Sequence, residues 1–128
     1  MTPQQAITTL DRFLEANGET ITLRRVVGSS TQTNVDVTVR AAVGGYQPKE
    51  LVGSILQGDS RVIMSSSEIT AASWPVGSAG YSATYPGDQR VPLKNDRVIV
   101  SNKTMMVIAA NPISIHGELV RIELQVRG

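Results

Sequence analysis

The sequence predicts a mainly β domain: a small, partly open β-barrel or sandwich of about six strands, preceded by one N-terminal α-helix. The first observation is the segment 118–126, whose residues alternate strictly between apolar and polar, as in a strand with one buried face. The second is that this period recurs in shorter segments, whereas only residues 3–16 repeat with helical spacing. The third is the length of 128 residues, which suits one domain, with the helix over 1–18 and the barrel over 19–128.

The N-terminal helix has start and stop signals. Thr2 can cap its first turn, which opens with Pro3, and Asn17 and Gly18 end it. Apolar side chains share one stripe of this helix: Ala6, Ile7, Leu10, Phe13 and Leu14. Because a helix of this length is marginal alone in water, we expect the stripe to pack on the domain's own sheet or on a neighbouring subunit.

The first strands follow directly. Residues 20–27 and 35–41 alternate in polarity, and a polar run separates them, so they are expected to form an antiparallel pair. A third strand covers residues 61–64. A capping box from Ser65 to Glu68 then predicts the start of a short helix.

The C-terminal third predicts the remaining strands. Residues 96–100 and 104–110 bracket Ser101-Asn102-Lys103, a polar turn of hairpin length. Asn111-Pro112, followed by His116-Gly117, is expected to turn the chain into the last strand, in which Val120, Ile122, Leu124 and Val126 share the buried face.

Two segments, 44–58 and 73–93, fit neither pattern and are predicted to be long loops. The tyrosines and the single tryptophan lie in or beside them, whereas the strands carry aliphatic side chains. Tyrosine and tryptophan dominate binding interfaces, so the loops are expected to contact partners; alternatively, the aromatic side chains cover the open ends of the barrel. The predicted interface residues are Tyr46, Pro48, Leu51, Trp74, Pro75, Tyr81, Tyr85 and Arg90.

The composition argues against catalysis. The chain has no cysteine and one histidine, His116, so thiol nucleophiles and sulfur-based zinc sites are excluded and a metal could bind only to carboxylates. Asp59 with Glu68, or Asp88 with Asp96, are the candidate carboxylate pairs. We therefore predict that the protein is not an enzyme and has no cofactor, metal site or catalytic residue. We also expect neither export nor membrane insertion, because no charged leader or bilayer-length apolar run is visible.

A resemblance adds to this interpretation. The segments that carry it are 22–25, 36–40, 58–62 before Trp74-Pro75, 96–100, 107–111, and 119–128 with the ending Leu-Gln-Val-Arg-Gly. In these strand and turn patterns the chain resembles small neck proteins of tailed phages and prophages, in the head closure (head-tail joining, stopper) group. The resemblance extends from about Thr2 to Gly128, although residues 76–92 are longer than the corresponding connection.

The resemblance implies a structural virion protein, made in the host bacterial cytoplasm and located in the virion neck. It would form a ring of its own copies between the portal or adaptor protein and the tail proteins, close the DNA exit channel and offer a surface for tail docking. DNA would pass without sequence-specific binding, which agrees with the formal charge of +1.

Three alternatives remain open from the sequence. The chain could be a tail completion or terminator protein of the same neck. It could be an OB-like module that binds single-stranded nucleic acid, with Trp74 and the tyrosines stacking on bases and Arg24, Arg25, Arg40 and Arg61 contacting phosphates. A small hydrolase that uses carboxylates is the third.

Overall fold

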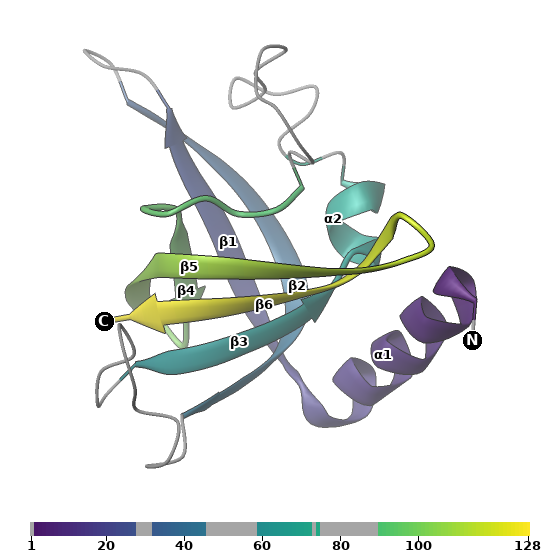
Figure 1. Ribbon diagram of the computed structural model, residues 1–128. Helices are drawn as coiled ribbons and strands as arrows, with labels where there is room; N and C mark the ends of the chain where they lie inside the picture. Colours follow the sequence, from purple (N-terminus) through teal and green to yellow (C-terminus); the bar gives the residue numbers. More distant parts are fainter. Residues whose placement is uncertain (1, 28–31, 46–58, 73, 75–89) are drawn as a thin grey trace.

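Six antiparallel strands close into a barrel in the order β1-β2-β3-β6-β5-β4 (Figure 1). The computed structural model describes residues 2–27, 32–45, 59–72, 74 and 90–128. Its elements in chain order are α1 (Pro3–Asn17), β1 (Glu19–Val27), β2 (Thr33–Gly45), β3 (Ser60–Ser65), α2 (Ser67–Ala71), β4 (Arg97–Val100), β5 (Lys103–Ile115) and β6 (Glu118–Arg127). The predicted six-stranded barrel with an N-terminal helix is confirmed, and it is closed rather than partly open.

The barrel is closed by β4, which has four residues. It pairs with β1 over three positions, Thr22↔Ile99 to Arg24↔Arg97, and with β5 over four. By contrast, the predicted pair of β1 and β2 is confirmed over nine positions, from Glu19↔Ala41 to Val27↔Thr33. The seam between β1 and β4 is therefore the shortest ladder in the barrel.

The interior is packed with aliphatic side chains from every strand. Strand residues alternate between the interior and the outer surface, as the period of two predicts. The buried cluster consists of Ile21, Leu23, Val37, Val39, Ala41, Val62, Met64, Ile69, Trp74, Val98, Met105, Val107, Leu119, Ile122, Leu124 and Val126.

Helix α1 lies against the outside of the barrel, beside the turn between β5 and β6 (Figure 1). Its predicted N-terminus is confirmed as a capping box: Thr2 Oγ1 accepts a hydrogen bond from the Gln5 amide, and the Thr2 amide donates to Gln5 Oε1. At its other end, the Arg40 guanidinium on β2 donates to the carbonyl oxygens of Leu14, Glu15 and Gly18 at 3.2, 3.1 and 2.7 Å. The helix packs on its own sheet, the first of the two alternatives.

Three details of the sequence interpretation were wrong. The Ser65–Glu68 capping box does not form, because Ser65 ends β3 and bonds to Asp11, while Glu68 accepts a hydrogen bond from the Arg40 amide at 2.8 Å. Asn111-Pro112 is not a turn but lies inside β5. The turn is His116-Gly117 alone, with φ of 51° and 78°, the left-handed geometry of a two-residue hairpin.

The third error concerns the buried face of β6. The register shifts between Ile113↔Arg121 and Ser114↔Leu119, which leaves Val120 without an opposite residue. As a result Leu119 joins the core cluster with Ile122, Leu124 and Val126, whereas Val120 is buried, at 3% exposure, outside that cluster.

The close contact at Gly18 yields a test of how α1 is attached. A Cβ atom at this position would lie 2.6 Å from the Leu14 carbonyl oxygen and 2.9 Å from that of Ala41, both backbone atoms that cannot move aside cheaply. Gly18→Ala is therefore expected to lower the free energy of unfolding by about 1–3 kcal/mol, measured by urea denaturation. Gly44→Ala is the control, because nothing lies within 4 Å of its added Cβ. Equal stability of the two variants would contradict the tight junction.

Candidate functional site

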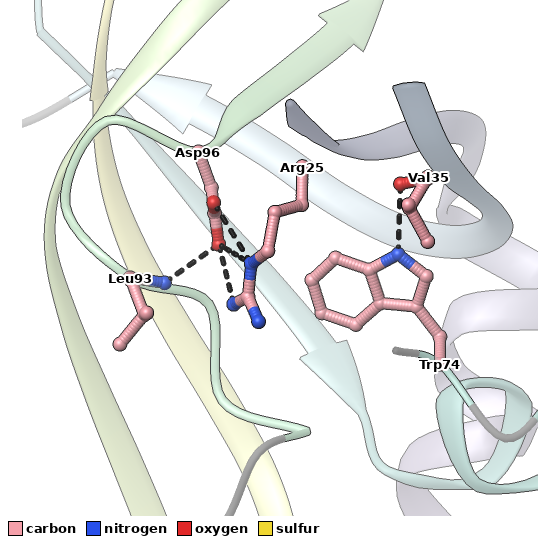
Figure 2. A network of polar contacts seen from close by, with 5 residues as sticks. All are labelled: Arg25, Val35, Trp74, Leu93 and Asp96. Atoms are coloured by element: carbon pink, nitrogen blue, oxygen red, sulfur yellow. Dashed lines mark hydrogen bonds and ion pairs between the residues drawn. The ribbon is translucent and has the colours of Figure 1, made fainter. Parts of the chain in front are cut away.

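A buried ion pair crosses the seam between β1 and β4 (Figure 2). Arg25 lies on β1, and Asp96 lies immediately before β4. The Asp96 carboxylate accepts hydrogen bonds from Arg25 Nε at 3.1 Å and Nη2 at 2.8 Å, and from the Leu93 amide at 2.8 Å. The carboxylate thus fixes both the guanidinium and the turn that leads into β4.

Trp74 packs on the other side of the same guanidinium (Figure 2). Arg25 Cζ lies 4.8 Å from the centre of the indole ring, within the range of a cation–π contact. The indole Nε1 donates to the Val35 carbonyl oxygen at 2.9 Å, and the residue is 3% exposed. Trp74 is part of the core, which agrees with the alternative that aromatic side chains cover the ends of the barrel.

The remaining predicted interface residues are only partly visible. Arg90 is half-buried, and its Nη1 donates to Thr70 Oγ1 on α2 at 2.8 Å. The other predicted positions lie outside the described residues: Tyr46, Pro48, Leu51, Pro75, Tyr81 and Tyr85. Of the predicted set, the structure therefore describes Trp74 and Arg90 alone.

Three arginines that the nucleic-acid interpretation invoked are engaged within the fold. Arg25 binds Asp96, and Arg40 binds the last carbonyl groups of α1. Arg24 forms a bidentate pair with Asp36 at 2.9 and 3.0 Å. Hydrogen bonds from this guanidinium to Asp36 raise the pKa of Arg24 above its ordinary value, so the pair holds its charge.

The described carboxylates of the candidate catalytic pairs also have structural partners. Asp59 is buried and accepts from Gln125 Nε2 and Arg127 Nε, both at 2.8 Å. The hydrogen bond to Asp59 raises the pKa of the Arg127 guanidinium. Asp88 lies outside the described residues. Within the described ranges no group of three or more His, Cys, Asp or Glu residues could hold a metal ion, and no helix is long and apolar enough to cross a membrane.

An apolar hollow lies outside the barrel, between α1 and the strands, with a volume of about 510 Å³. One wall consists of the α1 residues Ala6, Thr9, Leu10 and Phe13. The other wall consists of strand residues from β3, β5 and β6: Ile63, Ile113, Ile115, Val120 and Arg121. We call this hollow the α1 groove.

The α1 groove has the composition of a protein-binding surface. Phe13 remains 50% exposed on its wall, although a side chain of this size is normally buried where it can be. Arg121 is its one charged wall residue, and its Nε lies 2.9 Å from Glu123 Oε2, so the charge is compensated. Such a surface can bury an apolar side chain of a partner but holds no group suited to chemistry.

Sequence reasoning named only part of the α1 groove. It placed Leu10 and Phe13 on a stripe that packs against a sheet or a neighbour, but it did not find the strand wall. Val120 was assigned to the interior, and the register shift at this residue is what directs it to the groove.

A scan against models of protein families and a search of curated proteins give no match for this chain.

The ion pair across the seam can be tested by removing its acid. Asp96→Ala would leave the Arg25 guanidinium buried without a counter-charge, and Arg25 and Asp96 side chains are only 12% and 8% exposed. We expect the free energy of unfolding to fall by about 3–5 kcal/mol in urea denaturation. The matched control, Asp36→Ala, removes the acid of the more exposed Arg24 pair and should shift the urea midpoint far less. If both variants lost the same stability, the seam pair would have no special role.

Proposed function

We propose that this protein is a structural, ring-forming virion protein of the phage neck, of the head closure type. In this role it assembles with copies of itself between the portal or adaptor protein and the tail, closes the DNA exit channel and presents a docking surface for the tail. The neck assignment is supported by the resemblance of residues 22–25, 36–40, 58–62, 96–100, 107–111 and 119–128 to that family.

The observation that carries an assembly role is the location of apolar space in the described chain. The barrel interior is filled by side chains such as Ile122 and Val98, which are fully buried. The apolar hollow lies outside, in the α1 groove, beside a half-exposed Phe13. A ligand-binding barrel keeps its space within the strands, whereas a protein that acts through its surface keeps it on the outside.

The electrostatics also favour assembly over nucleic-acid binding. Trp74, the proposed stacking residue, is buried with its Nε1 bonded to a carbonyl oxygen, so its ring is not presented to bases. Arg24 and Arg25 are paired with aspartates, which cancels the positive charge that phosphates would need. The formal charge of +1 suits a channel component that lets DNA pass.

Binding measurements on the purified chain test this proposal. Light scattering is expected to show a closed oligomer at high protein concentration. Titration with a labelled single-stranded oligonucleotide should give little binding at either about 50 mM or about 200 mM salt. Tight binding that weakens steeply between these two concentrations would favour the OB-like alternative instead.

The location in the neck requires particles. In purified virions that carry this chain, cryo-electron microscopy should place its barrel between the portal region and the tail. Heads assembled without the chain are expected to lose packaged DNA, measured as DNA sensitive to added nuclease. Absence of the chain from mature particles would refute the proposal.

A further inference from the structure

Two large apolar side chains stand out as exposed in the described part of the chain: Phe13, at 50%, and Met106, at 39%. Phe13 lies on the wall of the α1 groove. Met106 lies on β5, where it pairs with Arg97 of β4 and Arg127 of β6. One residue thus belongs to a hollow, and the other projects from the barrel between two flanking strands.

The two features lie at opposite ends of the β5–β6 hairpin. The α1 groove lies at the end of the β5–β6 hairpin that carries its turn, beside α1, whereas Met106 lies near the start of β5, toward the C-terminus (Figure 1). Along β6, six residues separate Arg121 in the groove from Arg127 beside Met106, a distance of about 20 Å in a strand. Met106 cannot reach the groove of its own chain, so a contact between them has to join two copies.

Met106 stands in a basic setting. Arg97 has no ion-pair partner in the described part of the chain, while Arg127 is paired with Asp59. Ile99 lies on the same outer face of β4 as Arg97 and is half-buried, which widens the apolar patch around Met106. We call Met106 with Ile99 and Arg97 the β5 knob.

The rim of the α1 groove carries an exposed acid, Glu118. Glu118 is exposed beside Ile115, its register partner, and has no ion-pair partner in the described residues. Arg121 on the wall of the groove is compensated by Glu123, so it does not offset the charge of Glu118. A basic knob and an acidic rim attract each other, so the charges favour contact between unlike patches over contact between like ones.

We propose that the β5 knob of one copy docks in the α1 groove of the next copy, with Met106 inserted beside Phe13 and Arg97 facing Glu118. This inference rests on the proposed ring, for which it supplies the contact. Two different patches meet in it, which is the heterologous type of contact that closes rings.

The side chains suit this role. Methionine is unbranched and fills irregular apolar hollows, and its sulfur makes favourable contacts with aromatic rings such as that of Phe13. Arg97 of one copy and Glu118 of the next would form an ion pair at the rim of the contact. Ion pairs in this position guide the orientation in which two proteins meet. The buried methionine would supply most of the affinity.

Cross-linking tests the pairing, because the chain contains no cysteine and every introduced thiol is unique. Thr9→Cys places a thiol on the groove wall, and Thr104→Cys places one on β5 two residues from Met106; both positions are exposed. An equimolar mixture of the two variants, treated with a short bismaleimide, is expected to give a cross-linked dimer. A mixture of either variant with Asn34→Cys, exposed on β2, is the matched control and should give only background.

A second variant ties the product to the proposed contact. Met106→Ala in the Thr104→Cys protein removes an exposed side chain, so it leaves the core intact, and should reduce the dimer yield about tenfold or more. Thr38→Ala in the same protein, exposed on β2, should leave the yield unchanged. A yield with Thr9→Cys no higher than with Asn34→Cys, or a yield indifferent to Met106→Ala, would overturn the inference.

Light scattering of the unmodified chain at the same concentration distinguishes failure of the ring from failure of the proposed contact. If it forms a closed oligomer while the Thr9–Thr104 product is absent, the ring stands and the proposed contact is wrong. If it stays monomeric, self-assembly itself fails, and both the ring and this contact fall.

Discussion

The fold depends on closing the barrel at its shortest seam. β4 contributes four residues and meets β1 over only three positions, too few hydrogen bonds to hold two strand edges together reliably. The buried pair of Arg25 and Asp96 crosses this seam, Asp96 also orients the Leu93 amide, and Trp74 packs on the guanidinium from the other side. The polar network holds β4 in place between β1 and β5. Without β4 the barrel would be open, and the edges of β1 and β5 would be exposed.

Closure determines where the protein can act. Once the strands form a ring, the inward-facing residues fill the interior, and apolar side chains that are not needed there must lie on the outer surface. Helix α1 covers part of that surface and is fixed by Arg40, which bonds three carbonyl groups at its C-terminal end, and by Gly18, which allows close approach to Ala41. The α1 groove exists because the helix is held at this position.

The sequence predicted the periodic parts of this structure and missed those set by pairing. Alternation identified the strands, and the Thr2–Pro3 start identified α1. Asn111-Pro112 predicts a turn because both residues favour turns. In the structure, however, β4 pairs with β5 only as far as Met106, so Pro112 lies where no hydrogen bond to β4 is needed. The position of Val120 could not be predicted, because a register shift depends on the opposite strand. The strand wall of the α1 groove could not be predicted either, because it joins residues from separate elements.

The same strand pairing limits how copies of this chain could bind one another in the proposed ring. A closed barrel offers little edge for adding a strand from another subunit, and the part of β5 beyond β4 carries Pro112, which cannot donate a backbone hydrogen bond. In the proposed ring, copies of this chain would therefore meet through surface packing. A contact built on a single exposed methionine and a half-exposed phenylalanine leaves little apolar area uncovered in the free subunit. In the proposed role, such a subunit would form the ring where neighbours are brought together at high local concentration, as expected of a component that is added late to a particle.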